Sequence, residues 1–454
     1  MYDYDLIVIG GGPGGYEAAV RAAKLGLKTA LIEKDLPGGT CLNRGCIPTK
    51  ALLHASSLYN EAKNGASVGV VCDPSYDLCA MYEYKRQTVE KLRGGVEALL
   101  KTSGVTLLRG FGKITAKHTV EVGEAVITAE NVLIATGSVP ARPPIPGLDL
   151  PGVMTSDELL SDASSFGSIV IIGGGVIGVE FTTFFCDLGI RVTVVEGLDR
   201  LLPQFDREIG QNLAMIMKKR GVGVYTGAMV RSVTKDGAIL SVNFESGGKP
   251  TCVEAEAVLC AIGRRPYTDG LFGEGIAPET DGRRIKVNEN FETSVEGVYA
   301  VGDVSSKIQL AHVATAQGIY AVNVIAGKRN AVDLSVVPSC VYTRPEIASV
   351  GLTEQEAKDA GVPVKTGKAT TFSNGRTVIV NGARGFMKVV AHAETRKILG
   401  VQFMCENASD MIGSWGEAIA NGMTPEDMLR AMRPHPTFEE TMTAALEDLS
   451  AKLG

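Results

Sequence analysis

The strongest constraint on the fold is a pattern that occurs twice in the chain. Each copy reads as a buried apolar strand, a turn with glycines spaced G-x-G-x-x-G, a helix with small residues, and a second strand that ends on glutamate. The copies span residues 5–33 and 169–196, and in both the glutamate lies 23 positions after the first glycine. This plan predicts an α/β fold with two doubly wound, Rossmann-like domains.

The two turns also predict two nucleotide sites. Glycines allow backbone N–H groups to approach a pyrophosphate at the start of the following helix, and the glutamate accepts hydrogen bonds from ribose hydroxyls. The alternative is two ordinary strand–helix turns that are followed by acids by chance, and the repeated spacing argues against it. The candidate residues are Gly10, Gly12, Gly15 and Glu33 in the first copy, and Gly173, Gly175, Gly178 and Glu196 in the second.

Later segments fit the same plan. The apolar runs 131–138 and 257–266 each stop at a glycine, as later strands of the two sheets would. The segment 291–304 predicts a strand that ends at Asp303, which either caps the next helix or holds a cofactor hydroxyl. The last part of the chain alternates like an antiparallel sheet and then turns helical, so we assign this α+β part to dimerisation.

Composition excludes several classes of protein. A net charge of −6 without a basic cluster argues against nucleic acid as a partner. The N-terminus "MYDYDLIVIGGG" lacks the pattern of a signal peptide, and nine scattered cysteines favour a reducing cytoplasm. Residues 168–190 approach the length of a membrane span, but they contain three successive glycines, Glu180 and Asp187. We therefore expect a buried strand and helix there, and no membrane insertion.

The segment "GGTCLNRGCIPTK", residues 38–50, places Cys41 and Cys46 five positions apart. A zinc site would need further ligands, so we expect no metal, and a structural disulfide would be reduced in the cytoplasm. Two inert buried thiols or a working redox pair remain. The glycines and Pro48 predict a helix start, whose dipole and N–H groups favour a thiolate.

Together, "GGTCLNRGCIPTK", the two glycine turns, "YAVGD" and "HPTFEE" resemble the flavoprotein disulfide reductases, the class I pyridine nucleotide-disulfide oxidoreductases, over essentially the whole chain. The resemblance implies FAD at the first turn, NAD at the second, and a homodimer in which a His–Glu pair of the partner completes each site. It also implies an FAD-binding domain (1–145), an NAD-binding domain (146–265), a central domain (266–335) and a dimerisation domain (336–454).

The resemblance assigns individual roles as well. Cys41 would form the mixed disulfide with substrate and Cys46 would lie against the flavin. Lys50, near flavin N5, would pair with Glu180, and His435 with Glu440 would be the acid–base pair. Additional FAD contacts are expected at Gly112, Thr136, Asp303 and Ala311, and NAD contacts at Glu180, Val230 and Gly263.

Structural alternatives exist for several of these residues. Lys50 can be a solvated lysine, Glu180 a helix-start acid and His435 a loop histidine. Thr437 and Glu440 can form a capping box that starts the last helix. Arg44 and Thr49 differ from the commoner family residues and bear on the flavin potential.

The resemblance is strongest to members that oxidise protein-bound dihydrolipoamide and reduce NAD⁺, and Glu196 predicts NAD rather than NADP. The partner would be the lipoyl domain of an acyltransferase or the glycine cleavage H protein. The alternatives are an NADH-dependent reductase of another small disulfide, and a flavoprotein that serves a multienzyme complex mainly as architecture.

Overall fold

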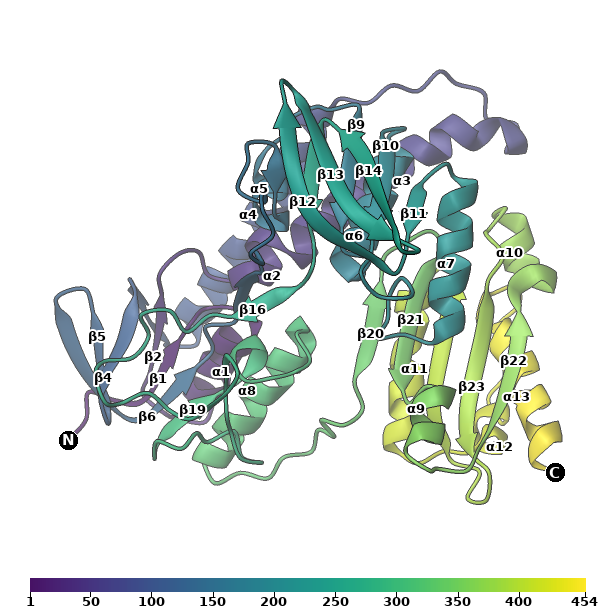
Figure 1. The fold of residues 1–454 in the computed structure, drawn as a ribbon. Helices are drawn as coiled ribbons and strands as arrows, with labels where there is room; N and C mark the ends of the chain where they lie inside the picture. The colour runs from purple at the N-terminus through teal and green to yellow at the C-terminus, as the bar shows by residue number, and fades with distance from the viewer. The chain divides into compact units, whose positions relative to one another are not determined.

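The computed structural model describes residues 1–454, which form two compact units (Figure 1). The first unit comprises Met1–Pro143, Met154–Ser165 and Ile262–Leu334. The second unit comprises Pro144–Val153, Phe166–Ala261 and Ser335–Gly454. Each unit therefore contains one of the two glycine turns, and the chain passes between the units several times.

The first unit is built on a sheet with the strand order β3-β2-β1-β6-β5-β4, in which β19 also pairs with β6. Its strands are β1 (Tyr4–Ile9), β2 (Thr29–Glu33), β3 (Thr106–Arg109), β4 (Gly112–Ala116), β5 (Thr119–Val122), β6 (Ala125–Ile134) and β19 (Val298–Ala300). Leu6 and Val8 enter one core, whereas Ile7 and Ile9 enter another, because successive strand residues point to opposite faces. Both faces of the central parallel strands are thus buried, as their continuous apolar runs predict.

Helices and short ribbons complete the first unit. They are α1 (Pro13–Lys24), α2 (Gly39–Arg44), α3 (Cys46–Asn64), η1 (Gly65–Val68), α4 (Leu78–Thr102), α5 (Ser156–Ser161), η2 (Gly302–Val304), α8 (Ala311–Ile325), the ribbon β7 (Ser138–Pro140) with β16 (Arg264–Pro266), and the ribbon β17 (Thr280–Asp281) with β18 (Arg284–Ile285). α1 packs closely on α8, because a Cβ atom added to Gly318 would lie 2.3 Å from the carbonyl oxygen of Gly14. The small residues of α1 therefore serve helix packing.

The second unit begins with a parallel sheet of order β11-β10-β9-β15, to which β8 adds an edge strand, and with the antiparallel layer β12-β13-β14. The strands and helices are β8 (Val153–Met154), β9 (Ser168–Ile172), α6 (Val176–Asp187), β10 (Arg191–Val195), α7 (Arg207–Lys219), β11 (Gly223–Tyr225), β12 (Ala228–Asp236), β13 (Ile239–Ser246), β14 (Lys249–Ala255) and β15 (Ala257–Cys260). β15 lies parallel to β9, as β6 does to β1, which confirms the two later strands expected from the sequence.

The C-terminal part of the second unit is an antiparallel sheet of order β20-β21-β24-β23-β22, coloured green to yellow in Figure 1. Its elements are β20 (Pro338–Val341), β21 (Glu346–Gly351), α9 (Glu354–Asp359), β22 (Val364–Thr370), η3 (Thr371–Ser373), α10 (Gly375–Ile379), β23 (Phe386–His392), β24 (Ile398–Cys405), α11 (Ala408–Ala420), α12 (Pro425–Leu429) and α13 (Glu440–Leu453). The fully buried Trp415 of α11 and Leu446 of α13 lie in the same core as Phe403 of β24. The α+β character expected for this part is confirmed.

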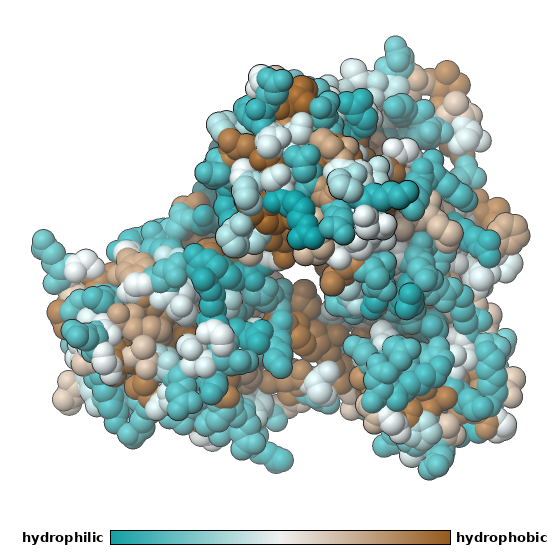
Figure 2. All heavy atoms as spheres, in the orientation of Figure 1, coloured by the Kyte–Doolittle hydropathy of each residue, from teal (hydrophilic) through white to brown (hydrophobic).

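The apolar segment 168–190 folds as the buried strand β9 and the helix α6 rather than as one long helix. No helix of the protein is long and apolar enough to cross a membrane. Figure 2 shows hydrophilic side chains over much of the visible face of each unit. The mixed α/β fold class is therefore the one that the sequence predicts.

Candidate active site

The first glycine turn connects β1 to α1 and leaves the start of α1 without a side-chain cap. Gly10 has φ +107° and a Cβ atom there would lie 2.4 Å from the carbonyl oxygen of Ala135, so only glycine fits. The Glu33 carboxylate accepts the N–H of Gly11 at 2.6 Å and the N–H of Asp35 at 2.7 Å. Uncapped N–H groups at a helix start, next to an acid at a strand end, form a cradle that fits a dinucleotide.

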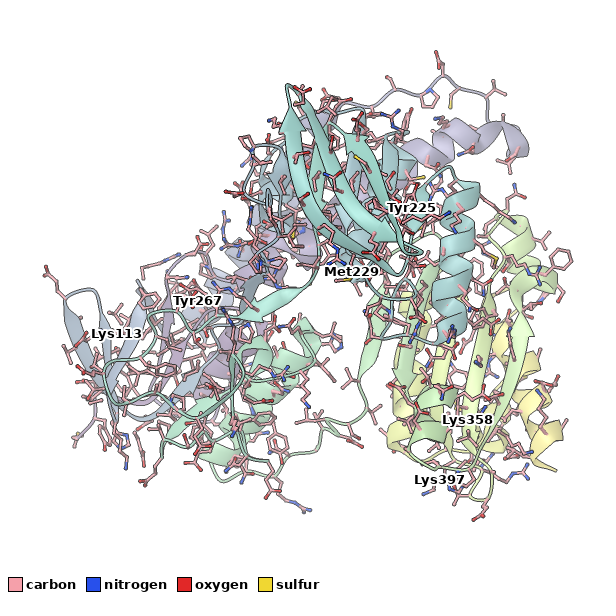
Figure 3. All side chains as sticks on the ribbon, in the orientation of Figure 1. Lys113, Tyr225, Met229, Tyr267, Lys358 and Lys397 are labelled. Carbon is pink, nitrogen blue, oxygen red and sulfur yellow. The ribbon has the colours of Figure 1, made fainter.

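The second glycine turn, between β9 and α6, repeats this arrangement atom for atom. The Glu196 carboxylate accepts the N–H of Gly174 at 2.5 Å and the N–H of Leu198 at 2.7 Å. Gly175 precedes α6 without a side-chain cap, and a Cβ atom added to it would meet nothing within 4 Å. Tyr225 and Met229, labelled in Figure 3, belong to the strands β11 and β12 that follow this turn in the chain. The second site therefore has the same open cradle as the first.

The cysteine segment is anchored directly on the first turn. Gly39, the first residue of α2, has φ +59°, and a Cβ atom there would lie 2.5 Å from Cα of Gly12. Cys41 lies in α2, and Cys46 is the first residue of α3, a helix of 19 residues. The helix start that the glycines and Pro48 predict is thus present, and it places one cysteine sulfur at the positive end of a long helix.

The two cysteines form no disulfide and share a hydrogen bond, and Cys46 is the more exposed of them. This hydrogen bond, burial and the charge of the Cys46 sulfur raise the pKa of the Cys41 thiol, while Lys50 opposes the rise. The two sulfurs therefore differ in burial, and burial and the contact with Cys46 disfavour a thiolate at Cys41. The geometry is that of a redox pair with two unequal sulfurs.

The position of Asp303 excludes one of the two roles that the sequence allowed for it. The helix α8 starts at Ala311 after Leu310, without a side-chain cap, so the interpretation of Asp303 as a helix cap is wrong. The carboxylate is instead half-buried, and its Oδ2 accepts a hydrogen bond from Ser138 Oγ at 2.5 Å. Burial raises the pKa of Asp303, and the Ser138 hydrogen bond opposes this rise.

The remaining nucleotide candidates lie as follows. In the first unit, Gly112 is the first residue of β4 and Ala311 is the first residue of α8. The Thr136 hydroxyl donates to the carbonyl oxygen of Tyr267 at 2.7 Å. Gly263, with φ +122°, also belongs to this unit. In the second unit, Val230 lies at a bulge of β12 and the buried Glu180 accepts the N–H of Tyr342 at 3.0 Å. Glu180 lies beyond the first turn of α6, so its interpretation as a helix-start acid is wrong.

His435 and Glu440 form a pair in the C-terminal part. His435 Nδ1 lies 2.8 Å from Oε1 of Glu440, and the imidazole is 78% exposed. The other carboxylate oxygen accepts the N–H of Thr437 at 2.8 Å, and both contacts lower the pKa of Glu440. The full capping box is not formed, because the Thr437 hydroxyl donates to Pro434 and the helix α13 starts only at Glu440. The carboxylate therefore orients an exposed histidine.

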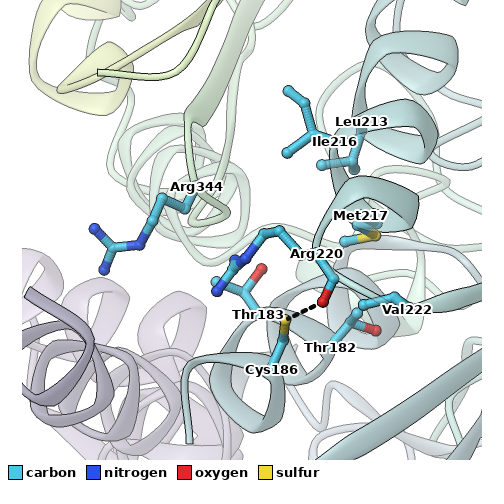
Figure 4. Close-up of a pocket in the computed structure, with 9 residues that line it drawn as sticks. All are labelled: Thr182, Thr183, Cys186, Leu213, Ile216, Met217, Arg220, Val222 and Arg344. Carbon is cyan, nitrogen blue, oxygen red and sulfur yellow. Dashed lines mark hydrogen bonds between the residues drawn. The ribbon is translucent and has the colours of Figure 1, made fainter. Parts of the chain in front are cut away.

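A small pocket behind α6 contains none of the candidate residues (Figure 4). Its walls include Cys186, whose thiol donates to the carbonyl oxygen of Arg220. Beside it, the buried Asp187 pairs with Arg220 at 2.5 Å and with Arg344 at 3.6 Å. These ion pairs connect α6 to α7 and to the C-terminal part, so the role of this pocket is structural.

Sequence reasoning missed two residues that touch the candidate site. Ser138 contacts Asp303, and Arg264 contacts Ser138, but neither was selected. The available signal was the run "GRRP" at the end of a buried strand, because two adjacent arginines rarely follow a core strand without an acidic partner.

Comparisons with known proteins show the family of the chain. Residues 4–318 match the family described as pyridine nucleotide-disulphide oxidoreductase, and residues 337–446 match its dimerisation domain. The chain is 39% identical to "Dihydrolipoyl dehydrogenase" of Bacillus subtilis, covering 98% of this chain and 97% of that protein. It is 41% identical to "Dihydrolipoyl dehydrogenase, mitochondrial" of Pisum sativum, with 97% and 90% coverage.

Among solved structures, the fold is similar to that of the Cu(II) complex of the HOCl-induced flavoprotein disulfide reductase RclA from Escherichia coli. The TM-score is 0.88 at 28% identity, covering 98% of this chain and 99% of that one. Sequence and fold thus agree over nearly the full length. The chain belongs to the pyridine nucleotide-disulphide oxidoreductase family.

Proposed function

We propose that the protein acts as a dihydrolipoamide dehydrogenase, which oxidises dihydrolipoamide to lipoamide and reduces NAD⁺ with FAD as its flavin. The observation that carries this proposal is the Cys41–Cys46 pair: Cys41 lies in α2, which packs on the first glycine turn through Gly39, and Cys46 begins α3. The relatives with 39–41% identity over nearly the full chain are dihydrolipoyl dehydrogenases, which supports the same activity.

The two cradles take different cofactors in this proposal. FAD binds at the first turn, where Glu33 accepts from a ribose and Asp303 from a hydroxyl of the flavin chain, and NAD binds at the second turn beside Glu196. We assign the supporting contacts to Lys50, Gly112, Thr136 and Ala311 for FAD, and to Glu180, Val230 and Gly263 for NAD. When bound, FAD supplies the transfer of two electrons from the thiols to NAD⁺ as hydride.

The side chains then carry out a thiol–disulfide exchange. The oxidised pair starts as a Cys41–Cys46 disulfide. A base removes the proton of one substrate thiol, and the resulting thiolate attacks the Cys41 sulfur and expels Cys46 as a thiolate. The second substrate thiol loses its proton and attacks the substrate sulfur of the mixed disulfide, which closes lipoamide and releases Cys41. The raised pKa of the Cys41 thiol suits these unequal roles of the two sulfurs, because in this scheme the released Cys41 takes up a proton while Cys46 keeps the negative charge.

The base is His435, held by Glu440, and it acts on the site of the partner subunit. The match of residues 337–446 to a dimerisation domain supports a homodimer, and His435 is exposed within its own chain. A neutral imidazole with one nitrogen oriented by a carboxylate can accept a proton at the other nitrogen. The His–Glu geometry therefore supplies the general base.

The finer features belong to the same proposal. The substrate is a lipoyl group carried by an acyltransferase domain or by a glycine cleavage H protein, in the cytoplasm. RclA is a flavoprotein disulfide reductase and is similar in fold, which keeps NADH-dependent reduction of another small disulfide as the second candidate.

A steady-state comparison tests the proposal. With dihydrolipoamide and NAD⁺ we expect turnover, and with glutathione disulfide and NADPH we expect none above background. Fast turnover only with a different disulfide and NADH would favour the second candidate and contradict the first.

A further inference from the structure

Arg264 lies at the centre of a buried polar network in the first unit. Its Nε donates to Ser138 Oγ at 2.8 Å, and its Nη2 donates to the Ser138 carbonyl oxygen at 2.7 Å. Ser138 Oγ in turn donates to Asp303 Oδ2 at 2.5 Å. The guanidinium is only 14% exposed, and Ser138 is buried. Two N–H groups of the fork thus fix the serine whose hydroxyl points at Asp303.

The fold brings these residues together from three separate strand ends. Ser138 follows β6, Arg264 follows β15, and Asp303 follows β19. β19 lies beside β6, and β7 pairs with β16 so that Pro266 faces Ser138 across the ribbon. The pairing of β19 with β6 brings Asp303 near Ser138, and the ribbon of β7 and β16 brings Arg264 to the same serine.

Charges of both signs surround this guanidinium. Asp157 of α5 has an Oδ1 atom 3.9 Å from Arg264 Nη1, and this oxygen is buried without a hydrogen bond. Burial lowers the pKa of Arg264, whereas Asp157, Asp303 and the Cys46 sulfur raise it, and Arg44 of α2 lowers it. Around the cysteine pair itself, Lys50 of α3 acts on Cys41. The charges that act on the cysteine pair thus include Lys50 on Cys41 and Arg264 on Cys46, while Arg44, Asp157 and Asp303 act on Arg264 itself.

We propose that Arg264 is a positioning residue that serves both halves of the site: through Ser138 it orients the Asp303 carboxylate toward the flavin, and its charge favours the thiolate of Cys46. The inference rests on the proposed function. A guanidinium retains its charge when buried, so one side chain can hold the carboxylate acceptor and stabilise the thiolate at every working pH.

The test uses the FAD-loaded Cys41→Ser protein, in which Cys46 is the only thiol of the pair. The long-wavelength absorbance of its thiolate–flavin contact is followed as a function of pH. Arg264→Gln removes the cation, so we expect the midpoint of this titration to rise by about one pH unit or more. Arg264→Lys keeps the positive charge, so its titration midpoint should stay close to that of the Cys41→Ser parent. Arg265→Gln is the matched control: this neighbouring arginine of β16 pairs with Asp269 at the surface, and its loss should leave the midpoint unchanged.

A second variant separates the two roles. Ser138→Ala keeps the cation and removes the hydroxyl that reaches Asp303, so we expect FAD affinity to fall about 2- to 10-fold while the Cys46 midpoint stays in place. Arg264→Lys lacks the planar guanidinium that holds Ser138 through two N–H groups, so it should show a similar loss of FAD affinity. This variant tests whether Arg264 orients Asp303 even if Arg264→Gln fails to fold.

The outcomes distinguish the two proposals. An unchanged midpoint in loaded Arg264→Gln, an equal shift in Arg265→Gln, or undiminished FAD affinity in both Ser138→Ala and Arg264→Lys overturns the role of Arg264. Absence of FAD or of any thiolate–flavin absorbance in the Cys41→Ser parent contradicts the proposed function itself.

Discussion

The two glycine turns share their hydrogen bonds but differ in the segment that returns to them. In both, the glutamate at the strand end accepts the N–H of the middle glycine, 22 positions earlier in the chain. In both, the chain then comes back to the turn: Gly38 donates its N–H to the Gly11 carbonyl at 2.8 Å, and Leu202 donates to the Gly174 carbonyl at 3.0 Å. The turn itself is thus a common binding device.

The two segments that return to the turns lead to different elements of the fold. At the first turn the return is made by two glycines, and the chain continues directly into α2 and the cysteine pair. At the second turn the return is made by Leu202, and the chain continues to Asp206, which caps α7. A side chain of Leu201 also packs where a Cβ atom of Gly174 would lie, at 2.5 Å. Under the proposed function, the two turns would bind the dinucleotides, and only the segment that returns to the first turn brings a cysteine pair beside one of them.

The largest effect should come from the cysteines of the first returning segment. Cys41→Ser and Cys46→Ser should each reduce dihydrolipoamide turnover to background, because exchange needs both an attacked sulfur and a leaving sulfur. Cys46→Ser should also lose the long-wavelength absorbance on two-electron reduction, whereas Cys41→Ser should show it without reduction. Steady-state assays and absorbance spectra check this.

The control for these variants is Cys72→Ser, which changes an exposed cysteine outside the segment and should keep full activity. Identical spectra for Cys41→Ser and Cys46→Ser would contradict the unequal roles of the two sulfurs.

The next largest loss of activity should come from His435, which belongs to neither glycine turn. His435→Gln should lower dihydrolipoamide turnover by about 10²–10⁴-fold, which is the typical contribution of a positioned base. Reduction of an artificial electron acceptor by NADH involves only the two nucleotide sites and should survive.

Mixing inactive Cys41→Ser and His435→Gln subunits tests whether the base acts on the partner. A mixed dimer has one site with both native residues, so some activity should return. FAD-loaded mixed dimers that stay inactive would disprove the shared site.

The difference between the returning segments can also be tested sterically. Gly39→Ala introduces a Cβ atom 2.5 Å from Cα of Gly12 at φ +59°, so the free energy of unfolding should fall by about 2–5 kcal/mol from overpacking and backbone strain. Urea unfolding and retention of FAD on gel filtration measure this. Gly26→Ala isolates the strain, because its φ is +89° and nothing lies within 4 Å. Equal losses in the two variants would show that contact with the first turn is unimportant.

The sequence predicts what is encoded within one short window. The glycine spacing and the strand-end glutamates define both turns, and the strand periodicity predicts the parallel and antiparallel sheets. The Arg264–Ser138 contact joins residues 126 positions apart through an antiparallel ribbon of three residues a strand, and the run "GRRP" does not identify Ser138 as the partner. The capping box that Thr437 and Glu440 could form is incomplete, because the Thr437 hydroxyl donates to the carbonyl oxygen of Pro434 and α13 starts at Glu440.

The smallest expected effect is a change in nucleotide preference, which should distinguish Glu33 from Glu196. Both carboxylates accept the same two kinds of backbone hydrogen bond. A carboxylate that accepts from the ribose 2′-hydroxyl repels a 2′-phosphate, so the parent should prefer NAD⁺ over NADP⁺ in kcat/KM. Glu196→Gln removes the repulsion and should lower this preference about 10- to 100-fold, which corresponds to one hydrogen bond to a charged group. Glu33→Gln changes the equivalent atom of the first turn and should weaken FAD binding while leaving the nucleotide preference unchanged. If the parent used both nucleotides equally well, or if Glu33→Gln altered the preference as strongly as Glu196→Gln, the assignment of one cofactor to each turn would be wrong.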